Sequence, residues 1–178
     1  VEKDRVGGAG IHNGALWSKT WWELSREAYQ IRRNGVALSI NPPKFAYENI
    51  SDEVDQAVSD REEMLVHHMN NINTSFEDGT HLVFKKGSAS IKTQHEVEIQ
   101  SDDSTETVHA EHIILATGSR PRKLPHIPID EQHIFTSDGL NELEGFPKSM
   151  VILGAGVIGC EFATIFSNFG HTKVFLID

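Results

Sequence analysis

The stretch Met150-Val151-Ile152-Leu153-Gly154-Ala155-Gly156-Val157-Ile158-Gly159 decides the fold of this 178-residue chain. Its first four residues are continuously apolar, which is typical of a parallel strand buried on both faces. The glycines then have the spacing G-x-G-x-x-G. In this pattern the first glycine permits a tight turn, the second lets backbone approach a pyrophosphate, and the third lets the following helix pack closely on the strand.

The residues after these glycines complete a strand–helix–strand unit. Cys160 to Phe169 is predicted to be a helix whose free N–H groups face the phosphates, Gly170 ends it, and Lys173 to Ile177 forms the next strand. Asp178 follows 19 residues after Gly159, where a dinucleotide fold has the carboxylate that accepts ribose hydroxyls. Together these features predict a Rossmann-type nucleotide-binding unit.

Composition narrows the class of protein. A hydrophobic content of 38% supports a packed core, and a formal charge of −10 argues against nucleic-acid or anionic-membrane partners. No apolar run approaches the roughly 20 residues of a membrane span, and no secretory signal opens the chain. A single cysteine cannot form an internal disulfide, so we expect a cytoplasmic protein. The ten histidines show no ligand spacing, so we expect no metal site.

The rest of the chain predicts a second α/β region. Val1-Glu2-Lys3-Asp4 resembles a strand end that carries an acid, and Gly7-Gly8-Ala9-Gly10 is expected to be a loop. An amphipathic helix is predicted from Leu16 to about Arg33, ended by Asn34-Gly35, and a second helix over about 44–72. On the first helix the predicted buried face comprises Leu16, Thr20, Leu24, Ala28 and Ile31. Further predicted elements are strands at 81–84, 87–92, 95–100 and 107–116, the last with an apolar centre Ile113-Ile114-Leu115, and a short helix at 137–143.

These elements indicate an α/β fold with three parts. Residues 1–120 would form a parallel Rossmann-like sheet with a small antiparallel meander, 121–148 a proline-containing connector, and 149–178 the start of a second Rossmann-type domain. The chain begins without Met in strand-like sequence and stops at a nucleotide-binding carboxylate. We therefore expect it to be an internal piece of a longer protein.

Several motifs, in order, resemble those of the FAD-dependent pyridine nucleotide–disulfide oxidoreductases, such as dihydrolipoamide dehydrogenase and glutathione reductase. The resemblance covers nearly the whole chain. The matching segments are Val1-Glu2-Lys3-Asp4, Ser18-Lys19, Gly87-Ser88-Ala89, Ala116-Thr117-Gly118-Ser119-Arg120-Pro121, Thr136-Ser137-Asp138, Pro147-Lys148 and Gly154 to Glu161.

The resemblance implies bound FAD, a nicotinamide nucleotide, and specific site residues. Glu2 would hold the adenosine ribose of FAD. Lys19 and Glu161, the two catalytic residues we expect, would form the ion pair beside the flavin N5 and would also contact the bound cofactors. The remaining FAD-binding residues would be Gly8, Ala9, Gly10, Ala89, Ala116, Thr117 and Gly118, and the NAD-binding residues Gly154, Gly156, Val157, Ile158, Gly159 and Asp178.

The chain departs from this family at the redox disulfide. The two cysteine positions of G-G-T-C-x-x-x-x-C are occupied by Gly10 and Ala15, which cannot form thiolates. The segment Ile11-His12-Asn13-Gly14 is instead similar to that of soluble pyridine nucleotide transhydrogenases. Cys160 is expected to be a small core residue, and Trp17, Trp21 and Trp22 to pack.

We therefore expect part of an oxidoreductase that passes hydride between a nicotinamide nucleotide and FAD without a protein disulfide. The alternative is a nucleotide-binding pseudoenzyme that keeps FAD as structure. Asp178 favours NAD(H), with NADP(H) as the alternative nucleotide, because basic residues beyond it would admit both. By resemblance the parent protein would be a homodimer through a domain that this chain lacks.

Overall fold

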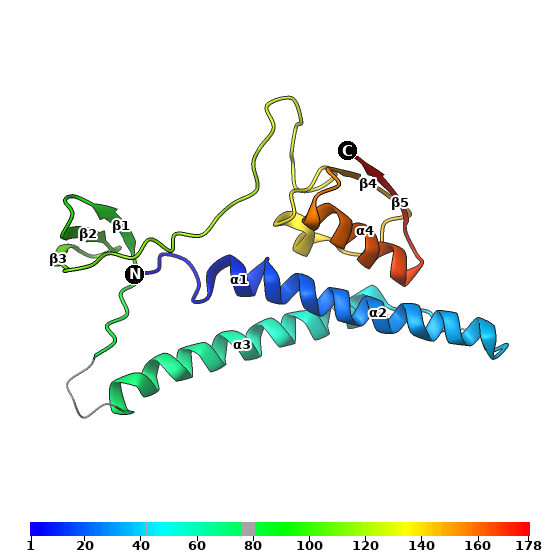
Figure 1. Cartoon of the computed structure of the whole chain (residues 1–178), viewed down its shortest axis with the longest axis horizontal. Helices are drawn as coiled ribbons and strands as arrows, with labels where there is room; N and C mark the ends of the chain where they lie inside the picture. The colour runs from blue at the N-terminus through cyan, green and yellow to red at the C-terminus, as the bar shows by residue number, and fades with distance from the viewer. Residues whose placement is uncertain (42, 76–80) are drawn as a thin grey trace. The chain divides into compact units, whose positions relative to one another are not determined.

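The computed structural model describes residues 1–41, 43–75 and 81–178, and for 73–75 only the backbone. The chain divides into two compact units, whose elements Figure 1 labels. The first comprises residues 1–9 and 60–119, and the second comprises 10–59 and 120–178. The predicted domain limits, 1–120, 121–148 and 149–178, stay a prediction.

The first unit contains a three-stranded antiparallel sheet, which confirms the small meander. Its strands are β1 (Ser88–Ile91), β2 (Glu96–Gln100) and β3 (Thr105–His109), in the order β1-β2-β3. The turn from β2 to β3 is closed by a hydrogen bond from the Ser101 N–H to the Ser104 carbonyl, 2.9 Å long. Glu2 forms a parallel bridge with Lys86, just before β1, so the predicted strand end at residues 1–4 is reduced to one bridge.

Two strand predictions in this unit are wrong. Residues 81–84 have irregular backbone, and the strand predicted at 107–116 ends at His109. The apolar centre Ile113-Ile114-Leu115 of the predicted strand is not a buried core, since Ile114 is 89% exposed. Its apolar side chains lie in irregular backbone, and a strand forms only where a neighbouring strand pairs with it.

The second unit is built on two long helices and a strand–helix–strand unit. Helix α2 runs over Ala15–Ala37 and helix α3 over Tyr47–Ser75, of which residues 47–59 belong to this unit. Strands β4 (Ser149–Leu153) and β5 (Lys173–Ile177) pair in parallel, and α4 (Val157–Phe169) connects them. A short 3-10 helix, η1 (Gly139–Glu142), lies within the predicted connector helix.

The predicted strand–helix–strand unit is confirmed, but its predicted burial is wrong. Gly170 has a left-handed φ of +76° and ends α4, as its sequence position predicts. Along β4 only Met150 and Ile152 are partly covered, whereas Val151 is 58% and Leu153 61% exposed. Helix α4 packs on one face of the β4–β5 pair, so alternate residues of β4 point away from it. Cys160 is likewise exposed and not a core residue.

Helix α2 differs from the predicted helix in where it ends and in which of its faces is buried. It continues past Asn34-Gly35 to Ala37, because Gly35 is buried in the helix and the left-handed turn occurs at Ser39, whose φ is +55°. Ala28 is buried as predicted, but the first three positions of the buried stripe are offset by one from the predicted ones, and Ile31 is exposed. The stripe comprises Trp17, Trp21, Ser25 and Ala28, because the indoles occupy the interface with α4.

Aromatic side chains form the core of the second unit. Trp21 contacts Tyr47 and Phe169, with ring centroids 5.3 and 5.9 Å apart, and Phe146 lies 5.0 Å from Phe169. Trp17 and Trp21 are buried, which confirms their predicted packing role, and Trp22 is partly exposed. Burial raises the pKa of Tyr47 to about 12, and the nearby carboxylate of Asp55 adds to this rise.

Candidate functional site

The turn between β4 and α4 has the geometry of a nucleotide-binding glycine turn. Gly154 has a φ of +106°, which L side chains rarely adopt, and its N–H donates to the Ile177 carbonyl at 2.7 Å. A Cβ on Gly159 would lie 2.0 Å from the Gly154 carbonyl oxygen, so only glycine lets α4 pack this close. A Cβ on Gly156 would meet nothing within 4 Å. The first and third glycines are therefore required by the fold, and the second borders open space.

Asp178 lies at this same turn. Its Oδ1 accepts a hydrogen bond from the Ala155 N–H at 3.3 Å, so the end of β5 and the glycine turn are adjacent. Val157 and Ile158 form the first turn of α4 with exposed side chains, and the N–H groups of such a turn have no partner within the helix. Free N–H groups, the helix dipole and a nearby carboxylate fit the pyrophosphate and ribose of a dinucleotide.

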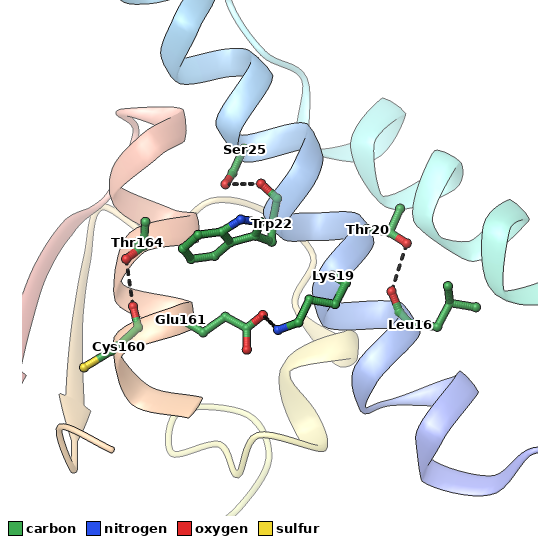
Figure 2. A network of polar contacts seen from close by, with 8 residues as sticks. All are labelled: Leu16, Lys19, Thr20, Trp22, Ser25, Cys160, Glu161 and Thr164. Atoms are coloured by element: carbon green, nitrogen blue, oxygen red, sulfur yellow. Dashed lines mark hydrogen bonds and ion pairs between the residues drawn. The ribbon is translucent and has the colours of Figure 1, made fainter. Parts of the chain in front are cut away.

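Lys19 and Glu161 form an ion pair between α2 and α4. The Lys19 Nζ donates to the Glu161 Oε1, and Figure 2 shows the two side chains pointing toward one another. The Glu161 side chain is only 12% exposed, whereas that of Lys19 is 62% exposed. The carboxylate is thus held by its surroundings, and the ammonium keeps an open side. A cation so oriented can stabilise negative charge on a bound group.

The residues assigned to FAD by resemblance are divided between the two units. In the first unit, the Glu2 backbone pairs with the segment entering β1, since the Gly87 N–H donates to the Glu2 carbonyl at 3.0 Å. The Glu2 Oε1 accepts the Asp4 N–H at 2.8 Å. Ala89 lies on β1 with an exposed side chain, two residues after Gly87. The structure therefore brings Glu2 beside the strand that carries Ala89.

Two glycine-containing segments complete this set. Ala116, Thr117 and Gly118 lie in exposed irregular backbone after β3, where Gly118 has a φ of +74°. Gly8, Ala9 and Gly10 were predicted to form a loop, but they are the start of a short helix, α1 (Gly8–His12). That prediction is wrong because glycine lowers helix stability without preventing a single turn. A Cβ on Gly8, Gly10 or Gly118 would meet nothing within 4 Å, so a ligand can approach these backbones closely.

The sequence patterns did not identify three polar residues that meet between α2 and α4. Asn168 donates to the Ser25 Oγ at 3.2 Å, and Arg32 Nη1 donates to the Asn168 carbonyl at 2.8 Å. The available signal was Ser25 itself, a polar residue four positions after the apolar Trp21 and eight after Trp17. Within the described ranges, no three His, Cys, Asp or Glu side chains gather as a metal site would require.

The comparisons with known proteins define the class. Residues 6–178 match the family described as pyridine nucleotide-disulphide oxidoreductase, and the chain belongs to this family of flavoprotein oxidoreductases. A soluble pyridine nucleotide transhydrogenase of Sodalis glossinidius is 32% identical over 98% of this chain and 36% of its own length. A dihydrolipoyl dehydrogenase of Chlamydia pneumoniae is 32% identical over 96% of the chain and 35% of its own length. The chain thus spans about a third of these relatives.

Solved structures agree at the level of the fold. LpdA from Mycobacterium tuberculosis matches 98% of this chain with a TM-score of 0.79 and 23% identity, over 37% of its own length. The HOCl-induced flavoprotein disulfide reductase RclA of Escherichia coli, solved as a Cu(II) complex, matches 98% of the chain with a TM-score of 0.76 and 22% identity, over 35% of its own length. The family uses nicotinamide nucleotides as substrates. Among the helices that the structure describes, none has the length and apolar character needed to cross a membrane.

Proposed function

We propose that the protein carrying this chain transfers hydride between a nicotinamide nucleotide and FAD without a redox disulfide. The observation that supports this most is the Lys19–Glu161 ion pair, because it is a charged pair with one open side on the two helices that follow the glycine segments. FAD, when bound, would supply the hydride chemistry. Lys19 would stabilise the negative charge of the reduced cofactor, and Glu161 would hold the Lys19 ammonium in place.

The cysteine positions support the absence of thiol chemistry. Gly10 and Ala15 occupy the places of the family's two redox cysteines, and Cys160 is the single cysteine of the chain. Cys160 lies on α4, where its Sγ donates to the Ala155 carbonyl at 3.2 Å. Dithiol–disulfide exchange needs two thiols that can reach one another, so electrons would pass from the nucleotide to FAD and on to a diffusible acceptor.

The direct test is anaerobic mixing of the full-length protein with NADH. We expect a yellow protein whose flavin absorbance bleaches on mixing, and a Lys19→Met variant that keeps FAD but is reduced at least about tenfold more slowly, equal to about 1.4 kcal/mol of barrier. An unchanged reduction rate would remove Lys19 from the reaction. Flavin that stays oxidised with NADH and NADPH would favour a pseudoenzyme. Turnover of dihydrolipoamide or oxidised glutathione as fast as that of an artificial acceptor would contradict the absence of thiol chemistry.

We also propose that the nucleotide site prefers NAD(H). Asp178 would accept hydrogen bonds from the ribose hydroxyls, whereas a 2′-phosphate would put like charge against it. The two effects should give about thirty- to a hundredfold tighter binding of NADH than of NADPH, equal to about 2–3 kcal/mol. Titration of the full-length protein with each nucleotide measures this ratio. Asp178→Asn, which keeps an acceptor for the Ala155 N–H, should reduce it to a few-fold; equal or tighter NADPH binding by the unaltered protein would contradict the assignment.

A further inference from the structure

Two polar contacts between α2 and α4 occur in the same order along both helices, and a third lies at the C-terminal end of α4. Lys19 meets Glu161, then Ser25 meets Asn168, and finally the Arg32 guanidinium donates to the Ser167 and Asn168 carbonyls at 3.4 and 2.8 Å. Lys19 and Ser25 are six residues apart, and Glu161 and Asn168 are seven. At about 1.5 Å per residue these separations are about 9 and 10.5 Å, so the contacts match along the helices.

Ser25 restricts how far α2 and α4 can shift along one another. Its side chain is fully buried, with 0% exposure, and its Oγ donates to the Trp22 carbonyl at 2.8 Å while it accepts from Asn168 (Figure 2 shows the Trp22 bond). A buried polar group that loses a partner costs free energy because water does not replace the partner. Sliding of α2 by one turn, about 5.4 Å, would separate Ser25 from Asn168 and break the hydrogen bond that the buried Ser25 Oγ accepts.

Arg32 fixes the other end of this interface. Its guanidinium lies at the C-terminus of α4, where the last carbonyls lack helical partners and the helix dipole is negative. Gly170 leaves space for this guanidinium, because a Cβ at residue 170 would lie 2.1 Å from the Arg32 Cζ. The glycine that ends α4 therefore also admits the side chain that binds the end of α4.

The aromatic contacts between the same helices are less directional than these hydrogen bonds. Trp17 lies 6.1 Å from Phe162, and Trp21 lies 5.9 Å from Phe169, between ring centroids. Apolar burial is non-directional and scales with the area removed from water, so it holds the helices together and tolerates small shifts. Hydrogen bonds weaken steeply with distance and angle, and they select one alignment.

We propose that Ser25, Asn168 and Arg32 are positioning residues that fix the register of α2 on α4 and thereby hold the Lys19 ammonium against Glu161. The effect of this register on flavin reduction rests on the proposed function. The register itself does not, because it concerns only contacts within the chain. Two experiments separate these parts.

The first experiment measures the register without FAD chemistry. The full-length protein carries Lys19→Cys and Glu161→Cys in a Cys160→Ser background, and a short bifunctional thiol reagent cross-links the pair. Arg32→Met and Ser25→Ala should each slow cross-linking about fivefold or more, since small displacements of reacting groups cost large factors in rate. Arg33→Met, which changes the exposed neighbouring arginine, is the matched control and should leave the rate unchanged. Unchanged cross-linking in both Arg32→Met and Ser25→Ala would overturn the proposal.

The second experiment asks whether the register acts through Lys19. Arg32→Met and Asn168→Ala should slow flavin reduction by NADH about five- to tenfold when Lys19 is present, and less than about twofold when Lys19 is replaced by Met. Arg32→Lys, which keeps a cation at the helix end, should recover part of the rate. Equal slowing with and without Lys19 would overturn the positioning role. A protein that NADH does not reduce would contradict the proposed function, and the cross-linking rates would still decide the register.

Discussion

The two units of the chain bury their side chains very differently. The second unit has a continuous aromatic core around Phe169, which is 2% exposed and contacts Trp21, Phe45 and Phe146. In the first unit, Ile99 of β2 is the single buried hydrophobic side chain among the described residues. Both units contain helix and paired strands, so secondary structure alone does not reveal this difference.

The comparison shows which forces hold each unit. Burial of apolar area is the dominant favourable term in folding, and it is concentrated in the unit that carries the glycine turn and the Lys19–Glu161 pair. The three-stranded sheet depends on backbone hydrogen bonds and on exposed ion pairs such as Lys85–Glu106, which contribute little. We expect the sheet to open more readily than the core around α4.

The largest effect should come from Phe169→Ala. Removal of a buried aromatic ring should lower the free energy of opening of α4 by about 3–5 kcal/mol, because a cavity remains between Trp21 and Phe146. Native-state hydrogen exchange of the α4 amides measures this change. The amides of β1, β2 and β3 serve as the internal control and should change little. Equal loss of protection in the sheet would break the comparison, because the two units would then open together.

A smaller effect should come from Ile99→Ala in β2. We expect a loss of about 2 kcal/mol, at the low end for aliphatic truncation, because the sheet is shallow and can relax around the site. Hydrogen exchange of the β1–β3 amides reports the change, with α4 as the control. A loss below about 0.5 kcal/mol would show that backbone pairing holds the sheet without this side chain.

The pKa of Tyr47 adds a pH test of the aromatic core. Because the pKa in the folded protein is raised to about 12, the folded state keeps the phenol proton after the unfolded chain has lost it near pH 10. The stabilisation is therefore complete below pH 10 and is lost as the pH rises through 12. Partial exposure screens the effect, so we expect about 1 kcal/mol. Unfolding between pH 9 and 12 measures it, and an identical slope in Tyr47→Phe would contradict the assignment to this residue.

The smallest effect should come from Lys85→Met in the first unit. Lys85 Nζ lies 2.7 Å from one Glu106 carboxylate oxygen, but both side chains are exposed to a third or more. We expect a change below about 0.5 kcal/mol, which added salt should reduce further. Hydrogen exchange of β3 in low and high salt measures it. A loss above about 1 kcal/mol would mean that ion pairs stabilise the sheet in place of a core.

Local patterns predicted the glycine turn of the candidate site. The glycine spacing at 154–159 predicts the turn because Gly154 needs a positive φ and Gly159 must lie against a carbonyl, and both are local backbone requirements. Cys160 and the centre Ile113-Ile114-Leu115 were misassigned, because apolar character indicates what a residue prefers and not what covers it.

The sequence by itself therefore determined the strand–helix–strand unit, the family, and the identities of Lys19, Glu161 and Asp178 as site candidates. The tertiary structure decided which face of α2 is buried, because Trp17, Trp21 and Ser25 pack against α4 in place of the predicted aliphatic residues. It also decided that Asn168 meets Ser25 and Arg32, since Asn168 is more than 130 positions from each of them along the chain and no short-range pattern connects them. Periodicity specifies the faces of one helix, whereas register between two helices is set only when their side chains pack.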